Sequence, residues 1–464
     1  MNHSDQTARE DVALFLNACM AATHVADALV FLHRYVCTHY RALYARVLAL
    51  PINDTNRLLI VAQLLRHGRG INARQRALEH TLITRTLQEV QVNRVYRCFY
   101  DLCRAGVNNR RTRAVMRAFL LARPDLAFHA VKYRSKLKRI ITHNHIKVSA
   151  EIYDYLCRGA QGRPRWETPL FERVRLVHFE RAAIYDLPLA IAETLAAQYG
   201  IPRRRFLEHM KDRLTAKEKI RLNNSMTREK VRHQDHLLKA PLMQAANAAL
   251  AIPAAERLAD RDRWESILSH AAKRLAARLQ RRFGKVALVI DNSDSSFRLR
   301  DAANRSLAVG LSLAYVLPHV AEQVRLFWTR PVSEPMAAEP LGLTNLAIPV
   351  IDALQSDADT VLIVSDGDEN VHRGGADLAV RVARCAAAPG RSIQVFHLNP
   401  TYDDAALQPK ALGPHITTLG LRDPRYFDFG LECAFFQKGR RSIQDLIRYL
   451  DQVAARWSDF EQSA

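Results

Sequence analysis

The segment KVALVIDNSDSS, residues 285–296, carries the clearest indication of the fold class of this chain. After Lys285 it is apolar through Ile290, and polar side chains follow directly. A run that is apolar at every position is typical of a strand buried on both faces of a sheet. Beyond that run, Asp291, Ser293 and Ser295 alternate along the chain. The stretch therefore predicts a buried strand whose end presents three oxygen-bearing side chains on one side.

Strand-like and helix-like segments alternate from this stretch towards residue 464. Such alternation is typical of a doubly wound, mostly parallel α/β sheet. The expected strands are residues 285–290, 324–328, 360–364 and 392–397. The expected helices are residues 300–317, 344–354, 376–387 and 442–457.

The preceding residues, from about 11 to 282, have a different pattern. Apolar side chains recur there at spacings of three and four, which predicts helices of ten to twenty residues joined by short loops. Residues 254–282 look like one long basic helix that leads to the first strand. We expect an α plus α/β protein with two domains, a HEAT-like helical array at 1–282 and an α/β domain at 283–464. The array is either a closed ring or an open arc.

The charge of the chain is unevenly distributed. The whole chain carries +21, whereas residues 1–282 hold 50 basic and 25 acidic side chains, a net charge of +25. The remainder is therefore slightly acidic, at −4. Residues 101–150 alone hold twelve lysines and arginines against two acids. A cationic field of this kind attracts polyanions and releases their counterions on contact, so we expect the helical part to bind a polyanion.

The acidic part gathers its oxygen ligands at predicted strand ends. Asp291, Ser293 and Ser295 follow the first strand, Asp366 follows the strand at 360–364, and Thr344 lies in the loop between. Carboxylates and hydroxyls without histidine or cysteine are a hard donor set that suits Mg²⁺ or Mn²⁺. The chain has neither a GxxxxGK[ST] phosphate loop nor a GxSxG nucleophile elbow. We therefore expect no enzymatic activity.

This pattern of Asp-x-Ser-x-Ser, then Thr, then Asp resembles the metal-ion-dependent adhesion site of von Willebrand factor A domains. The resemblance covers residues 283–464. It implies that Asp291, Ser293, Ser295, Thr344 and Asp366 bind a divalent cation, with Mg²⁺ expected ahead of Mn²⁺. It also implies that the ion docks a protein partner at this rim. In this chain Asp294 stands where the family usually has a small or apolar residue.

A second resemblance lies in the basic cluster. The segments RTRAV (111–115), AFHAVKYR (127–134) and HIK (145–147) resemble the TROVE module of Ro autoantigen proteins. That module is a ring of HEAT-like repeats followed by a von Willebrand A domain. The family binds small structured non-coding RNAs on its outer surface, and the single-stranded ends of misfolded RNAs through the ring.

The matching positions imply that Lys132 and His145 contact RNA, with Arg134 or Lys136 as the next cation. With the neighbouring cations of the same cluster, the candidate RNA-binding residues are Lys132, Arg134, Lys136, Lys138, Arg139, His145 and Lys147.

The rival hypothesis is a protein-interaction adaptor, in which the A domain recruits a partner and the helical scaffold has no specific RNA role. Both hypotheses predict a cytoplasmic protein. The seven cysteines form no CxxC motif, the first residues do not resemble a signal peptide, and no apolar stretch is long enough to span a membrane.

Overall fold

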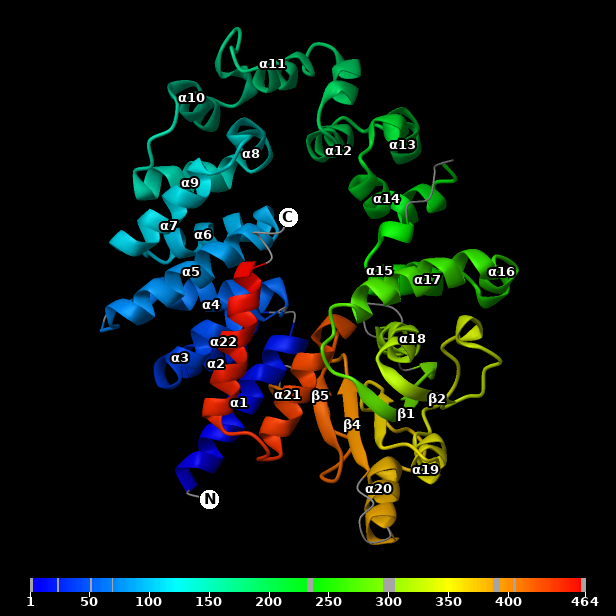
Figure 1. Ribbon diagram of the computed structural model, residues 1–464. Coiled ribbons are helices and arrows are strands. Elements are labelled where there is room, and N and C mark those ends of the chain that lie inside the picture. The colour runs from blue at the N-terminus through cyan, green and yellow to red at the C-terminus, as the bar shows by residue number, and fades with distance from the viewer. Residues whose placement is uncertain are drawn as a thin grey trace. The chain divides into compact units, whose positions relative to one another are not determined.

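The computed structural model describes residues 3–22, 25–50, 52–68, 70–231, 237–294, 305–386, 393–403 and 406–459. The chain forms two compact units (Figure 1). Unit 1 comprises Met1–Asn56 and Leu237–Ala464, and unit 2 is Arg57–His236. The change from helices to strands falls at Phe283, as expected. The first helices belong to the same compact unit as the sheet, so these units differ from the expected domains 1–282 and 283–464. The expected domain boundaries stay a prediction.

Unit 1 contains a five-stranded parallel sheet in the order β2-β1-β3-β4-β5. The register places Ile290 at the end of β1 beside Trp328 of β2 and Val364 of β3. The predicted doubly wound α/β fold is confirmed, and all four expected strands are present. The strands are β1 (Phe283–Ile290), β2 (Ala321–Trp328), β3 (Thr360–Val364), β4 (Gln394–Asn399) and β5 (Thr417–Gly420).

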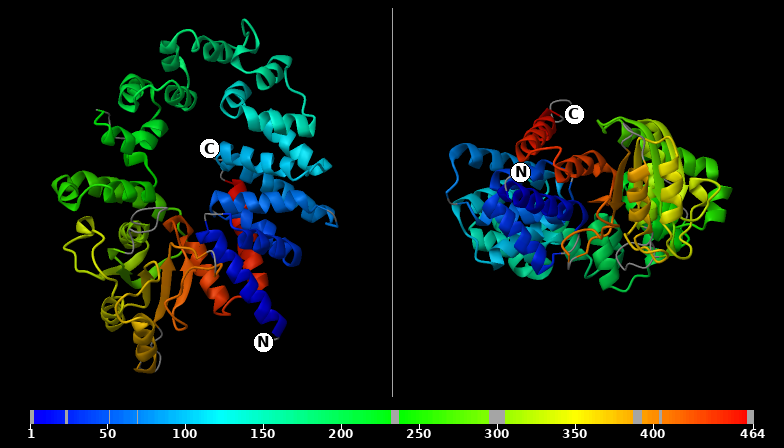
Figure 2. Two further views of the ribbon diagram at one scale, coloured as in Figure 1. Left: turned by 180° about the vertical axis from the view of Figure 1, so that it is seen from behind. Right: turned by 90° about the horizontal axis from the view of Figure 1, so that it is seen from below.

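Helices cover both faces of this sheet. On one face α18 lies so close to β1 that a Cβ atom at Gly310 would be 2.5 Å from Cγ2 of Ile290. On the other face Ala287 and Val289 share a core cluster with Val350 of α19 and Val380 of α20. Burial on both faces explains why the strands are apolar at consecutive positions rather than at alternate ones. Figure 2 shows this unit from two further directions.

The other helices of unit 1 come from both ends of the chain. Helix α1 packs on β5 and α21, and α3 packs on α22. The long helix expected over 254–282 is instead two helices, because the backbone leaves the helical conformation at Asp260 (φ −114°, ψ 39°). The helices are α1 (His3–Ala21), α2 (Asp27–His39), α3 (Arg41–Arg46), α15 (Leu242–Leu250), α16 (Ala254–Ala259), α17 (Arg261–Ala276), α18 (Arg305–Val316), α19 (Ala347–Gln355), α20 (Gly375–Ala386), α21 (Phe427–Gln437) and α22 (Ile443–Asp459).

All regular secondary structure among the described residues of unit 2 is helical, as predicted. Its later helices enclose a core that includes Ile184, Phe206 and Met226, with Phe128 and Val131 packed against it. Helix α4 (Asp54–Arg66) begins just before the boundary with unit 1. The remaining helices are α5 (Ala73–Glu89), α6 (Val92–Arg104), α7 (Arg110–Leu121), α8 (Leu126–Lys132), α9 (Arg134–Asn144), α10 (Ala150–Arg158), α11 (Pro169–Leu176), α12 (Leu189–Gln198), α13 (Arg203–Met210) and α14 (Ala216–Arg228). None of the helices described in either unit is both long and apolar enough to cross a membrane.

Candidate RNA interface and candidate metal site

The two units differ in net charge. Unit 2 contains 37 lysines and arginines against 16 aspartates and glutamates, a net charge of +21. Unit 1 contains 31 of each and is neutral overall. All of the excess positive charge therefore lies in 180 residues, where it acts as one cationic field.

Four of the predicted RNA-binding residues line one hollow of unit 2. The hollow, about 490 Å³ in volume, lies over the junction of α8 and α9, and its lining residues include Lys132, Arg134, Lys136 and Lys138. No acidic side chain lines it among the residues described. The arrangement can neutralise an anionic group that enters the hollow.

Capping side chains fix the helices on either side of this hollow. Asp125 precedes α8 and accepts a hydrogen bond from the backbone N–H of Phe128 at 2.8 Å. Ser149 caps α10 in the same way, with its hydroxyl accepting from the N–H of Ile152 at 3.3 Å. Such caps satisfy backbone donors that a helix leaves unpaired at its first turn.

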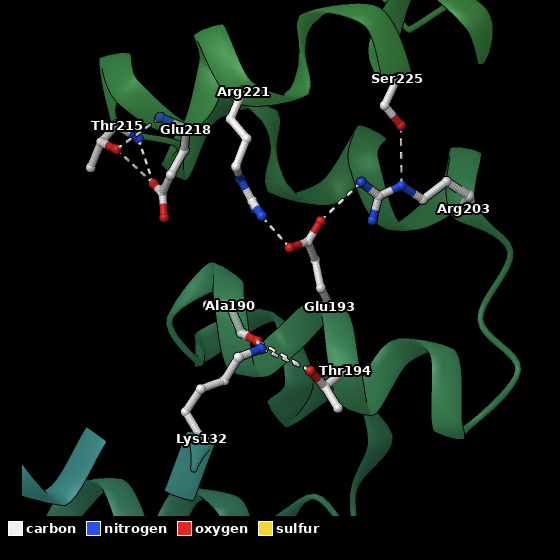
Figure 3. A network of polar contacts seen from close by, with 9 residues as sticks. All are labelled: Lys132, Ala190, Glu193, Thr194, Arg203, Thr215, Glu218, Arg221 and Ser225. Carbon is white, nitrogen blue, oxygen red and sulfur yellow. Dashed lines mark hydrogen bonds and ion pairs between the residues drawn. The ribbon is translucent and has the colours of Figure 1, made fainter. Parts of the chain in front are cut away.

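Lys132, the last residue of α8, is tied to a neighbouring helix (Figure 3). Its Nζ donates to the carbonyl oxygen of Ala190 and to Oγ1 of Thr194, the latter at 3.0 Å. Burial lowers the pKa of Lys132, the charge of Glu193 partly opposes that effect, and the charge of Arg221 adds to it. The ammonium therefore keeps one donor for a ligand while two hold α8 against α12.

A carboxylate that the sequence reasoning missed organises the adjacent cations (Figure 3). Glu193 of α12 accepts hydrogen bonds from Arg203 at 2.9 Å and from Arg221 at 2.7 Å, and Arg203 also donates to Ser225. Burial alone would raise the pKa of Glu193, but the hydrogen bonds from Arg221 and Arg203 outweigh burial and lower it. Nothing in the sequence marks Glu193, because its partners are 10 and 28 residues away.

Arg134 at the start of α9 bonds to the protein backbone. Its Nε donates to the carbonyls of Tyr155 and Leu156 at 3.2 and 3.1 Å, and one terminal nitrogen donates to that of Cys157 at 3.0 Å. These carbonyls lie in the last turn of α10, where the helix leaves acceptors unpaired and its dipole favours a cation. Arg134 therefore caps α10 as well as lining the hollow.

The other predicted RNA-binding residues are distributed around α9 and its end. Lys138 and Arg139 are exposed on α9, whereas Lys136 is half-buried. His145 ends α9 in the left-handed conformation, with φ at 50°, and it is exposed, as is Lys147. Arg139, His145 and Lys147 do not line the hollow.

Tyr133, an aromatic residue within the basic cluster, packs among other rings. It lies 5.2 Å from the ring of Tyr96 and 6.0 Å from that of His129, and Tyr96 and His129 are hydrogen-bonded at 2.8 Å. These contacts leave Tyr133 half-buried, and burial raises its pKa.

The candidate metal site lies where the strand order of the sheet reverses. Asp291 follows β1, and Asp366 follows β3 after one residue. These strands are neighbours, and the connections from them lead to opposite sides of the sheet. Such a switch point leaves an open crevice at the carboxyl ends of the strands, where α/β sheets bind ligands.

Three loops meet at this crevice. The hydroxyls of Ser293 and Thr344 are 2.6 Å apart, and the N–H of Ser293 donates to Oδ1 of Asp291 at 3.0 Å. The backbone of Asp294 donates to Gly342, which joins the first loop to the second at 2.8 Å. The structure thus brings Asp291, Ser293, Thr344 and Asp366 to one rim, and Ser295 lies outside the described residues.

The residues present fit a divalent cation. Asp291 is fully buried, and among the described residues its Oδ2 has no hydrogen-bond partner. Burial, with the charge of Asp366 in addition, raises the pKa of Asp291 to about 6. A buried carboxylate oxygen without a partner is costly, and a cation would relieve both the burial and the repulsion. Only two carboxylates belong to the set, and the described residues contain no cluster of three or more acidic, histidine or cysteine ligands.

Two further residues position Asp291. The hydroxyl of Thr329 lies 3.3 Å from Oδ1 of Asp291 and donates to Oδ1 of Asn292 at 2.8 Å. Asn292 also accepts from the N–H of Arg330. Thr329 directly follows β2, so the rule that strand ends carry the ligands would have identified it in the sequence.

Comparison with solved structures shows a likeness over nearly the whole chain. No family model matches the chain, and none of the curated proteins searched matches it either. The crystal structure of the Ro (Rsr) protein of Deinococcus radiodurans matches with a TM-score of 0.56 and 15% identity, covering 94% of this chain and 100% of that one. The chain therefore has the fold of a Ro protein, with a large helical region and a parallel five-stranded α/β sheet.

Proposed function

We propose that the protein is a non-enzymatic RNA-binding scaffold of the Ro type, which binds small structured RNA or the ends of misfolded RNA. The observation that carries this proposal is the concentration of the entire net charge of +21 in unit 2, which also contains a hollow lined by four cations. Phosphate contacts of this kind give affinity with little reading of sequence. The likeness to a Ro protein supports the same function.

The cations divide between binding and support. Lys136 and Lys138 line the hollow, their side chains make no hydrogen bond or ion pair with the described residues, and they would bind phosphate directly. Arg139, His145 and Lys147 would extend this contact along the RNA. Lys132 and Arg134 hold α12 and α10 in place, and both residues also line the hollow.

Charge reversal tests the proposed function. The variant carrying Lys136→Glu and Lys138→Glu should bind a structured RNA at least tenfold more weakly, and the salt dependence of its binding should fall by about two phosphate contacts. The matched control carries Lys217→Glu and Lys219→Glu on α14, which changes the charge of unit 2 equally. Equal losses in the two variants would show that overall charge, rather than the hollow, determines binding.

We also propose that the rim of unit 1 binds Mg²⁺ or Mn²⁺ through Asp291, Ser293, Thr344 and Asp366, with Ser295 as a fifth ligand. A bound cation would supply an open position for a carboxylate or phosphate of a partner. The unpartnered Oδ2 of Asp291 and its raised pKa support this assignment.

Thermal unfolding with and without Mg²⁺ tests the metal site. A cation at one hundred times its Kd stabilises the bound state by about 2.7 kcal/mol, which corresponds to a rise in Tm of about 4–5 °C for a unit of this size. Asp291→Ala should abolish the rise, and Asp294→Asn, a change at an exposed neighbour, should retain it. If the unchanged protein shows no rise, this assignment is wrong.

Apolar side chains beside the rim favour a protein partner there. Leu341, Leu343 and Ile348 are all more than half exposed, and they flank Thr344 in sequence. Exposed apolar residues around a charged site are typical of protein-interaction surfaces. This observation keeps the adaptor function as a second candidate, and it is compatible with RNA binding by unit 2. Retention of a protein partner by the Lys136→Glu, Lys138→Glu variant would separate the two functions.

A further inference from the structure

One exposed aromatic residue of unit 2 differs from the rest. Phe179 is 72% exposed, more than any other large hydrophobic side chain described. It lies in the turn between α11 and the 3₁₀ helix η3 (Arg181–Asp186). The turn is ordered by backbone hydrogen bonds from the N–H groups of Phe179 and Glu180 to the carbonyl of Leu176, both at 2.8 Å. The ring is therefore held outward by the fold and is not on a loose segment.

A fixed guanidinium covers one face of this ring. The Cζ atom of Arg175 lies 5.4 Å from the ring centroid of Phe179. Arg175 itself is clamped by Glu172, with Nε donating at 2.9 Å and a terminal nitrogen at 2.6 Å to the two carboxylate oxygens. One oxygen of Glu172 also accepts from the N–H of Trp166 at 3.0 Å. The guanidinium plane is thus set before any ligand arrives, and binding costs little ordering entropy.

A second ring and a second arginine lie in the same region. The phenol of Tyr199 is hydrogen-bonded to Nδ1 of His178 at 2.9 Å, and the two rings meet edge to face. The Cζ atom of Arg181 lies 5.7 Å from the centroid of Tyr199. Residues 178–181 therefore join three rings to two arginines, with Glu180 as the acid of the turn. Aromatic rings interleaved with arginine are the chemistry that holds unpaired bases, because bases stack on both.

We infer that the turn at Phe179 is a stacking site for an unpaired nucleobase of RNA. The open face of Phe179 receives the base, Arg175 backs the ring, and Arg181 neutralises the adjoining phosphate. This inference rests on the proposed function and adds a selectivity that phosphate contacts lack. A base inside a duplex cannot stack on a protein ring, so the turn distinguishes unpaired RNA from paired RNA.

The test compares two RNA probes of equal phosphate number, a single-stranded oligoadenylate with one 2-aminopurine and a blunt RNA duplex. Phe179→Leu, which keeps an apolar side chain without a ring, should bind the single strand about tenfold more weakly, the order expected for one lost stack. The affinity of this variant for the duplex should not change. Binding of the unchanged protein should quench the fluorescence of the 2-aminopurine, and binding of Phe179→Leu should not. Phe179→Trp should bind the single strand as the unchanged protein does.

Tyr153→Leu is the matched control, because Tyr153 is an exposed aromatic of the same unit (49%). It should leave both affinities unchanged. The inference is overturned if Phe179→Leu binds the single strand normally, or if it weakens single strand and duplex in equal proportion. A change in oligomeric state with normal RNA binding would assign the ring to a protein contact instead. Failure of the unchanged protein to bind either RNA would overturn the proposed function as well, whereas normal RNA binding with no effect at Phe179 overturns this inference alone.

Discussion

Arg134 provides a sharp test of whether a cation in the RNA-binding cluster supports the fold. The sequence assigns it to RNA, whereas the structure places its guanidinium on the carbonyls of Tyr155, Leu156 and Cys157. We predict that Arg134→Ala loosens α10. A charge-assisted hydrogen bond contributes about 1.5–3 kcal/mol, but water can replace part of it at a helix end that is partly open to solvent. A loss of about 2 kcal/mol is therefore expected from the set.

Native-state hydrogen exchange measures this loss where it occurs. A loss of about 2 kcal/mol lowers the protection of the α10 amides roughly 30-fold. Arg134→Lys should lower the protection of the α10 amides almost as much, because an ammonium keeps the charge but cannot bridge three carbonyls. Lys138→Ala, one helical turn further along α9, should leave α10 unchanged. Unchanged protection of α10 in Arg134→Ala together with a large loss of RNA affinity would refute the reasoning, since Arg134 would then act only on RNA.

Three further predictions concern stability. Burial lowers the pKa of His397 to about 3, below its value in the unfolded chain, so the stability that neutral His397 supports is fully present above about pH 6.5 and is lost as the pH falls. At pH 5 the free energy of unfolding, measured by urea titration, should have fallen by about 2 kcal/mol more than in His397→Gln. Glu79→Ala should leave Arg111 buried without its 2.8 Å partner and destabilise unit 2 by about 3 kcal/mol, with Glu79→Ala, Arg111→Met recovering part of the loss in thermal melts. Gly310→Ala should destabilise unit 1 by about 1–3 kcal/mol, because the new Cβ would overlap Ile290; an unchanged Tm would contradict the close packing.

Local sequence pattern was sufficient for most of the α/β fold. The strand at 360–364 was predicted to the residue, because a run buried on both faces leaves an uninterrupted apolar signature. Strand β5 (Thr417–Gly420) was missed, since four residues beginning with two threonines carry almost no pattern. Helix α21 (Phe427–Gln437) was missed for the opposite reason. It is buried nearly all round, so it shows no period that separates helix from strand.

The meeting of the candidate metal ligands was predictable because a parallel sheet converts sequence into proximity. The strand pattern places Asp291 and Asp366 at the same edge of a parallel sheet, and the pairing of β1 with β3 in the structure makes them neighbours there. The orphaned Oδ2 of Asp291, and the support from Thr329, depend on burial and on side-chain direction, which the strand pattern does not contain.

Composition and local pattern are sufficient for the net charge, for most of the helices and strands, and for the positions of the cations along the chain. Only the tertiary structure decided what each cation does, because its partners lie far along the chain. Lys132 bonds to a carbonyl 58 residues away and Arg134 to one 21 residues away. The return of residues 237–464 to the first helices also decided that one unit is neutral and the other holds the whole positive charge. Periodicity and composition are local properties, whereas packing joins residues without regard to their distance in sequence.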